Sequence, residues 1–287
     1  MTEDFKISVG DWVADNLPKG LVGAHISMYG VVSGDQEVKD AFELWRQRLA
    51  AQGWGAPTWP REYGGAGLTD AQAKVVSRAI TKAGSTNPIP YLAGMGVTMV
   101  GPTLLEYGTP EQKARHLPGM ASGEVRWCLG LSEPNAGSDL ASLNTSAELD
   151  EETWVLNGQK TWTSGADKSQ WCGALVRTDR SAAKRNGISF LMLEMDQPGI
   201  ETRPISLIAG ESPFCETFFT NAQARKDDLL GQMNDGWSVI KRLLQHERQS
   251  QTNAPAPSTT AEPLQDVAKR YLGTSADGTL TDSDMRS

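Results

Sequence analysis

The sequence contains few of the residues that bind metals or form disulfides. Only three of its 287 residues are cysteine and three are histidine. Cys128, Cys172 and Cys215 are far apart and odd in number, and the chain has no C-x-x-C pair or zinc-ligand spacing. We therefore expect no metal site and no disulfide framework, but three buried, reduced thiols of a cytoplasmic protein.

Long apolar runs and an excess of positive charge are also missing. Runs such as Ile188–Leu193 are too short to cross a bilayer. The net charge is −8 and the pI about 5.0, which argues against a nucleic acid or an anionic membrane as the main partner. The N-terminal MTEDFKISVG is acidic and fits neither a secretory signal nor a transit peptide.

Two common nucleotide-binding motifs are absent: no G-x-G-x-x-G follows a predicted strand, and there is no P-loop. The spacing of apolar residues changes twice along the chain. Helical spacing runs to about residue 124, short strands follow to about 232, and helical spacing returns after that. This order predicts an α+β fold with an N-terminal all-α domain (1–124), a middle β-barrel or β-sandwich domain (125–232) and a C-terminal helical domain (233–287).

Helices are predicted from apolar spacing and from capping residues. One apolar face is formed by Val38, Phe42, Trp45 and Leu49, and further helical stretches are expected at about 69–83 and 92–107. Thr109 to Gln112 has the composition of a capping box and predicts a helix start. After Gly236, apolar residues at helical spacing predict a helix to about Gln249, and a short one is expected at about 261–272.

In the middle region the strongest local signal is Asn157-Gly158, which separates two strand-like runs. Both central residues of a type I′ turn need positive φ, so this dipeptide predicts a β-hairpin. Further strands are expected at Trp171–Arg177, Ile188–Glu194, Ile200–Ile205 and Phe214–Thr220.

The first candidate site lies in RWCLGLSEPNAGSDLAS, residues 126–142. A strand at Trp127–Leu131 would present Ser132 at its end, and residues 135–138 would form a tight turn that ends in Ser138. The two hydroxyls and the N–H groups of such a turn can bind a pyrophosphate or the edge of a heteroaromatic ring. An ordinary β-turn with capping serines is the alternative interpretation.

The second candidate site is NGQKTWTSGA, residues 157–166. Trp162 can form a wall for a flat aromatic ligand, and Thr163 and Ser164 can hydrogen-bond the ligand's edge. The alternative is that Trp162 is a core residue at a strand end.

Taken in order along the chain, several motifs resemble the acyl-CoA dehydrogenase family. They are GWGAPTWPREYGGAGL (53–68), SEPNAGSD (132–139) and WVLNGQKTWTSGA (154–166), followed by Gly236-Trp237 and the HER of residues 246–248. The order of helices, β domain and helices fits the same family. The resemblance covers about residues 35–250.

Several properties follow from this resemblance. Members are FAD flavoproteins that remove two hydrogens from the α and β carbons of an acyl-CoA thioester. A carboxylate takes the α-proton, the flavin accepts the β-hydride, and an electron-transfer flavoprotein usually takes the electrons. The resemblance places Leu131 and Ser132 against the flavin ring and Ser138 near the pyrophosphate and the pantetheine arm. It places Trp162, Thr163 and Ser164 around the isoalloxazine.

One candidate for the base lies in the helix predicted from Gly236 to about Gln249. In some branches of the family it is a Glu directly before an Arg, which matches Glu247 and Arg248, and Arg248 matches a substrate-contacting residue. Glu247 follows Ile240 by seven residues and Leu243 by four, so it shares their apolar face and is partly desolvated, which favours a proton acceptor. The alternatives are a solvent-exposed Glu–Arg pair and a base elsewhere in the family's C-terminal domain.

Measured against the family's four-helix C-terminal bundle, the sequence suggests a truncated member with an incomplete bundle. Three hypotheses follow. The chain is an FAD-dependent acyl-CoA dehydrogenase, or a non-catalytic or half-site subunit that pairs with a full-length relative, or a flavin oxidase or monooxygenase on the same fold. The helix predicted from Gly236 to about Gln249 has an uncovered apolar face, which predicts a homo-oligomer or a hetero-oligomer.

Overall fold

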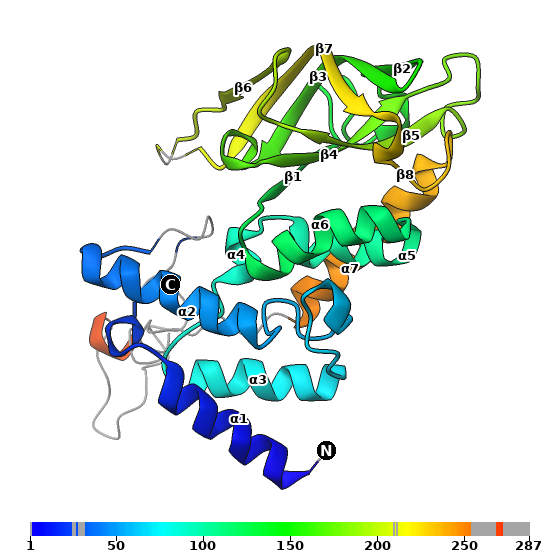
Figure 1. Ribbon diagram of the computed structural model, residues 1–287. Helices are drawn as coiled ribbons and strands as arrows, with labels where there is room; N and C mark the ends of the chain where they lie inside the picture. The colour runs from blue at the N-terminus through cyan, green and yellow to red at the C-terminus, as the bar shows by residue number, and fades with distance from the viewer. Residues whose placement is uncertain are drawn as a thin grey trace. The chain divides into compact units, whose positions relative to one another are not determined.

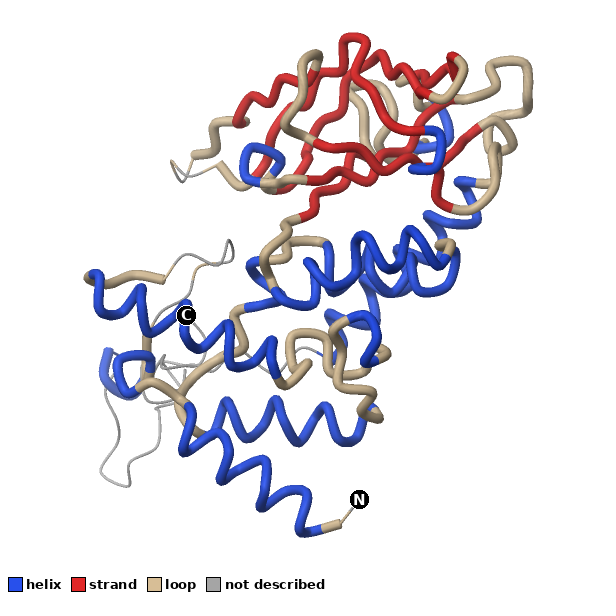
Figure 2. Tube along the Cα trace, in the orientation of Figure 1, coloured by secondary structure: helices blue, strands red, loops and turns tan. Residues whose placement is uncertain are grey.

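The fold was analysed in a computed structural model that describes residues 2–24, 27, 32–208, 210, 212–253 and 268–271 (Figures 1 and 2). Met1–Ser250 form one compact unit and Gln251–Ser287 a second. In Figure 2 the strands lie apart from the helices, and the predicted α+β class is confirmed. Of the helix expected at 261–272, residues 268–271 are helical and the others lie outside the described residues.

Helices make up the first part of the chain: α1 (Glu3–Asn16), α2 (Gln36–Ala51), α3 (Asp70–Lys82), α4 (Ile89–Leu92), α5 (Gly101–Tyr107) and α6 (Pro110–Ser122). The predicted apolar face of α2 is confirmed, because Phe42, Trp45 and Leu49 are buried. Thr109 and Gln112 form the predicted capping box. An equivalent box between Thr69 and Gln72 begins α3.

The helical stretch expected at about 92–107 is confirmed from Gly96 to Tyr107 and is interrupted before Gly96. The chain turns at Gly94, forms a π-helical segment at Gly96–Val100, and continues as α5. Gly94 has φ +61°, and a Cβ there would lie 2.6 Å from the Trp127 carbonyl oxygen, so only glycine allows this approach to the sheet. A tertiary contact therefore interrupts a stretch that has helical spacing.

The strands form one eight-stranded sheet in the order β6-β7-β3-β2-β4-β5-β8, with β1 paired in parallel to β4. The bounds are β1 (Trp127–Gly130), β2 (Ser146–Asp150), β3 (Thr153–Ser164), β4 (Trp171–Arg177), β5 (Ile188–Glu194), β6 (Ile200–Pro204), β7 (Phe214–Arg225) and β8 (Leu229–Leu230). The strand expected at Phe214–Thr220 thus continues to Arg225.

The hairpin predicted at Asn157-Gly158 is wrong, because both residues lie inside β3. The turn between β2 and β3 is at Glu151-Glu152, where Glu151 takes φ 52°. The register of β3 with β7 shifts beside Asn157, whose side-chain oxygen accepts the N–H of Asn221 at 2.9 Å. The Asn-Gly pair therefore lies at a β-bulge. Gly158 leaves room for Thr145, because a Cβ on residue 158 would lie 2.6 Å from the Thr145 Cα.

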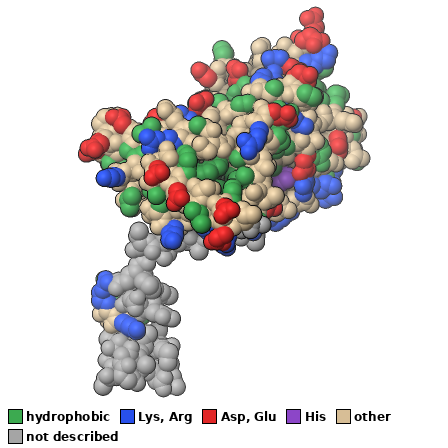
Figure 3. All heavy atoms as spheres, turned by 60° about the horizontal axis from the view of Figure 1, so that its bottom comes forward, with side chains coloured by type: hydrophobic (Ala, Val, Ile, Leu, Met, Phe, Trp, Pro, Cys, Tyr) green, Lys and Arg blue, Asp and Glu red, His purple; other side chains and the backbone are tan. Residues whose placement is uncertain are grey.

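One apolar core joins helices to the sheet. Leu104 of α5, Leu117 of α6, and Val239, Ile240 and Leu243 of α7 (Gly236–Asn253) pack with Trp127, Leu175 and Phe190 from the strands. The α5, α6 and α7 helices lie against the same side of the sheet (Figure 1). The core contains residues from all three predicted domains and does not divide at residues 124 and 232. The domain boundaries predicted there stay predictions. Figure 3 shows acidic, basic and apolar side chains interspersed on one face.

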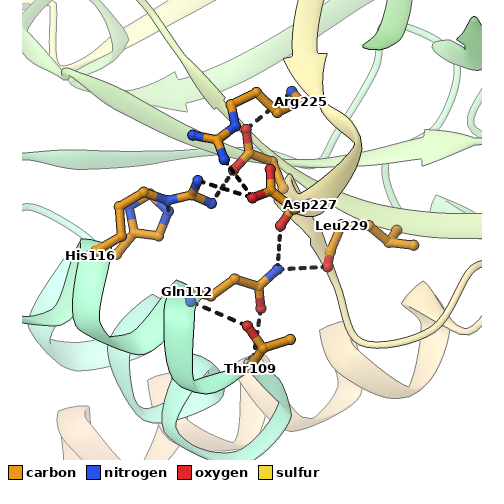
Figure 4. Close-up of polar contacts among 8 residues, drawn as sticks. Thr109, Gln112, His116, Arg225, Asp227 and Leu229 are labelled. Atoms are coloured by element: carbon orange, nitrogen blue, oxygen red, sulfur yellow. Dashed lines mark hydrogen bonds and ion pairs between the residues drawn. The ribbon is translucent and has the colours of Figure 1, made fainter. Parts of the chain in front are cut away.

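Polar contacts also tie α6 to the sheet (Figure 4). The Gln112 side-chain amide donates to the carbonyl oxygens of Asp227 at 2.7 Å and Leu229 at 2.9 Å. Arg115 donates to Asp228, whose carboxyl is nearly buried. These residues fix the end of β7 and the start of β8 over the N-terminal half of α6.

His116 packs beside two stacked tryptophans in this contact. Its ring meets Trp127 and Trp171 edge-on, with centroids 5.1 and 4.5 Å away. Burial and the neighbouring Arg115 cation lower the pKa of His116 to about 4. The neutral Nε2 accepts a hydrogen bond from Arg115 Nε at 3.0 Å.

The two capping boxes provide a matched test of the contact between α6 and the sheet. Gln112→Ala removes a box and two bonds to the carbonyls of Asp227 and Leu229, whereas Gln72→Ala removes a box alone. We expect Gln112→Ala to lower the free energy of unfolding by about 1–3 kcal/mol more than Gln72→Ala, at about 0.5–1.5 kcal/mol per bond. Urea unfolding of both variants measures the difference, and equal losses would contradict this role of Gln112.

Candidate functional site

A cavity of about 180 Å³ lies where the ends of β1 and β3 meet the segment before α5 and the second half of α7. It brings together five of the residues predicted from the sequence, namely Leu131, Ser132, Trp162, Ser164 and Glu247. The rest of its lining is mostly apolar and consists of Met95, Met99, Leu129, Thr161 and Leu244. Residues more than 100 positions apart in the sequence thus share one small space.

The end of β1 forms one wall of the cavity. Lys160 Nζ donates to the carbonyl oxygen of Leu131 at 3.1 Å, and the Thr161 N–H donates to that of Ser132 at 2.9 Å. Two successive peptide groups are therefore held by two successive residues of β3. The strand predicted to run to Leu131 ends one residue earlier, at Gly130, and Ser132 follows it after Leu131.

The turn after Ser132 differs from the prediction. Glu133 and Ala136 exchange both backbone hydrogen bonds at 3.0 Å, so the turn spans 133–136 and not 135–138. Pro134 explains the shift, because its fixed φ suits the second position of a turn. Ser138 is exposed and is not part of the cavity lining, so its predicted role stays a prediction.

Trp162 has an unusual backbone and an exposed ring. Its φ is 60°, and the register of β3 with β7 is interrupted between Lys160 and Thr163. The side chain is 55% exposed and meets Phe214 edge-on at 5.7 Å, so the alternative of a core tryptophan is wrong. Positive φ is costly for a bulky residue and is typical of functional sites.

Thr163 and Ser164 follow Trp162 but differ in environment. Ser164 is partly buried and lines the cavity. Thr163 is fully buried and is not part of the lining, and its hydroxyl has no hydrogen-bond partner within the described residues. A buried hydroxyl without a partner destabilises the fold, which marks this position as one to test.

Glu247 approaches the cavity from α7. It is partly buried and lines the cavity together with Leu244, one turn earlier on the same face. Arg248 is exposed and is not part of the lining, so its role as a substrate contact stays a prediction. The cavity thus has a carboxylate on one side and the hydroxyls of Ser132 and Ser164 on the strand side.

An ion pair behind the cavity wall was missed in the sequence. Lys160 and Glu133 are 0% and 7% exposed, and Nζ lies 2.9 Å from Oε1. Neither residue of this pair was among the candidate site residues. The alternation of side chains along a strand could have revealed this pair. Lys160 is an even number of residues from the buried Trp154 and Leu156, so its side chain belongs on the same face of β3 as theirs.

Within the described residues, no group of three His, Cys, Asp or Glu side chains could hold a metal ion. None of the helices in this part of the chain is long and apolar enough to cross a membrane.

The unpartnered hydroxyl of Thr163 yields a test. Thr163→Val keeps the shape and removes the buried polar group, so we expect it to raise the free energy of unfolding without ligand by about 1 kcal/mol. Thr103 is equally buried, but its hydroxyl donates to the Met99 carbonyl at 2.8 Å, so Thr103→Val should not stabilise the chain. Urea unfolding compares the variants. Equal losses of stability in both would mean that the Thr163 hydroxyl is satisfied.

The chain matches two domains of one protein family. The acyl-CoA dehydrogenase N-terminal domain matches residues 31–124, and the acyl-CoA dehydrogenase middle domain matches residues 128–222. The two matches are consecutive, which is the order expected from the sequence motifs.

Individual relatives agree with this match. Acyl-CoA dehydrogenase IpdE1 of Mycobacterium tuberculosis is 41% identical over 249 residues, which cover 86% of this chain and 63% of that protein. IpdE1 of Mycolicibacterium smegmatis is 40% identical over 259 residues, which cover 86% of this chain and 64% of its own length. The chain therefore spans less than two thirds of the length of these relatives.

Solved structures share the fold. The ChsE4-ChsE5 complex from Mycobacterium tuberculosis has a TM-score of 0.67 and 29% identity, with 97% of this chain and 68% of that chain covered. A steroid ACAD named Tcur3481-Tcur3483 has a TM-score of 0.67 and 28% identity, with 92% and 70% covered. By its domains, its relatives and its fold, the chain belongs to the acyl-CoA dehydrogenase family.

Proposed function

We propose that the chain binds FAD and carries out the α,β-dehydrogenation of an acyl-CoA thioester. The observation that carries this proposal is the cavity itself, which combines the Ser132 and Ser164 hydroxyls, the exposed ring of Trp162 and the carboxylate of Glu247. A dehydrogenation of this kind needs a proton acceptor opposite a site for a flat redox cofactor, and the two sides of the cavity supply these groups.

The residues present fit a flavin. Trp162 offers an aromatic face, and its strained backbone keeps that face out of the core. Ser132 and Ser164 offer hydrogen bonds to a polar ring edge. The unpartnered hydroxyl of Thr163, which is adjacent to two cavity residues, also favours a site that becomes satisfied when a ligand is bound.

Each residue then has a definite task. Glu247 takes the α-proton of the thioester on a carboxylate oxygen. FAD, when bound, supplies the acceptor for the hydride of the β carbon, and an enoyl thioester is left. Ser132 and Trp162 orient the ring edge and face, while Met95, Met99 and Leu244 exclude water from the reacting carbons.

A partner chain and an electron acceptor belong to the same proposal. The solved relatives ChsE4-ChsE5 and Tcur3481-Tcur3483 carry names of two components, and one is described as a complex. We propose that this chain also works in an oligomer, either with itself or with a relative of the family. An electron-transfer flavoprotein is the expected acceptor of its electrons.

The other hypotheses make different predictions. A flavin oxidase or monooxygenase would reoxidise rapidly with O₂ after reduction, whereas a dehydrogenase would need an electron-transferring partner or a dye. A non-catalytic subunit would stay oxidised with acyl-CoA. The carboxylate in the cavity favours the dehydrogenase over the non-catalytic subunit.

Flavin reduction tests the proposed function. The purified chain, saturated with FAD, is mixed anaerobically with a panel of acyl-CoA thioesters, and the visible absorbance of oxidised flavin is followed. We expect bleaching with at least one thioester. Glu247→Gln should keep FAD but lower the rate of bleaching by about 10²- to 10⁴-fold, because the proton acceptor is lost.

Glu194→Gln is the matched control, because Glu194 is an exposed carboxylate of β5 outside this cavity and should leave the rate unchanged. A chain that binds no FAD would contradict the proposal as a whole. If Glu247→Gln bleached at the rate of the unchanged chain, the assignment of the base would be wrong.

A further inference from the structure

The Lys160–Glu133 pair has no task in the reaction proposed above, yet it lies directly behind the cavity wall. Neither residue lines the cavity, and both side chains are almost fully buried. A buried ion pair is seldom a net source of stability, because desolvation of both charges opposes their attraction. The position of this pair therefore calls for an explanation other than stability.

Lys160 makes a second contact that gives such an explanation. Its Nζ donates to the Leu131 carbonyl oxygen at 3.1 Å as well as to Glu133 at 2.9 Å. The peptide between Leu131 and Ser132 is trans and planar, so its N–H points opposite to its C=O. The carbonyl is turned to the buried lysine, so the Ser132 N–H is turned away from it. Leu131 and Ser132 line the cavity and Lys160 does not, so we infer that this N–H faces the cavity.

Glu133 holds the lysine in place. Its Oε1 also accepts the Thr145 N–H at 2.9 Å, and its Oε2 accepts the Asn144 N–H at 2.7 Å. The pair thus joins the end of β1, the segment before β2, and β3. Gly130 lies against the lysine stem, since a Cβ there would be 3.2 Å from Lys160 Cγ.

Both groups are satisfied as charges. Desolvation opposes the ionisation of Glu133, but the Lys160 ammonium and the hydrogen bonds from Thr145 and Asn144 outweigh it and hold the pKa of Glu133 below its ordinary value. Burial lowers the pKa of Lys160, and the attraction of Glu133 offsets only part of that shift. The Leu131 carbonyl therefore accepts a hydrogen bond from an amine whose other partner is the Glu133 carboxylate.

We propose that Lys160 and Glu133 are positioning residues that fix the Leu131–Ser132 peptide so that the Ser132 N–H and hydroxyl face the flavin ring. This inference rests on the proposed function, because it presumes that FAD occupies the cavity. A fixed N–H donor at the ring favours the reduced, more electron-rich flavin, and needs no reorganisation when electrons arrive. The pair thereby raises the reduction potential of the flavin.

Two variants separate positioning from stability. Lys160→Met removes the donor and leaves Glu133 buried without its partner, so it should lower the urea midpoint strongly. The double variant Lys160→Met/Glu133→Gln removes both charges, so it should recover much of that midpoint. The Leu131 carbonyl still lacks its donor in the double variant, so the reduction potential should not recover.

The reduction potential of the FAD-loaded full chain is the decisive readout, measured by equilibration with redox dyes. In the double variant we expect reduced FAD to bind about tenfold more weakly relative to oxidised FAD, which lowers a two-electron potential by about 30 mV. Arg115→Met/Asp228→Asn is the matched control. It removes an ion pair between α6 and the residues after β7, outside the cavity lining, and should leave the potential unchanged.

Each outcome decides something. If the unchanged chain binds FAD and the double variant has the same potential, the pair is only structural and the inference fails while the proposed function stands. If the control double variant shifts the potential as much, the effect is not one of positioning. If the unchanged chain binds no FAD, the proposed function and this inference both fail.

Discussion

The buried contact between Lys160 and Glu133 is the constraint on which the arrangement of the cavity depends. It joins three segments that are separate in the sequence, and it holds the Leu131–Ser132 peptide group just after β1 by its carbonyl. Burial of the two charges is tolerated because each has several partners. The wall that carries Leu131 and Ser132 is therefore set from behind, by residues that never touch the cavity.

The opposite wall depends on packing. A single apolar core runs from α5 and α6 through β1, β4 and β5 to α7, and it fixes the helix that carries Leu244 and Glu247. The contacts of Gln112 and Arg115 with residues 227–229 tie α6 to the far edge of the sheet, outside the cavity lining. The Lys160–Glu133 pair behind one wall and the hydrophobic core behind the other thus hold the two halves of the cavity at a set separation.

Local signals predicted well what depends on local physics. The helix face of α2, the capping box of α6, the strand that leads to Ser132 and the helix that carries Glu247 follow from periodicity and capping alone. The turn at 133–136 was misplaced although Pro134, a local signal, determines it. The other failures involve partners distant in sequence. Asn157-Gly158 forms a bulge because Asn221 and Thr145 lie beside it, and the helix at 92–107 breaks where Gly94 meets Trp127. Motifs pointed to Trp162, but its positive φ and the Lys160–Glu133 pair depend on tertiary structure.

The central claim is that the ends of β1 and β3 and the face of α7 enclose the redox cofactor. A crystal structure of the chain with FAD tests it most directly. The account predicts that the flavin ring lies against Trp162 with its polar edge within hydrogen-bond distance of the Ser132 N–H or hydroxyl, and with the Lys160–Leu131 bond intact. A ring bound elsewhere on the chain, or a Ser132 N–H turned away from it, would contradict the account.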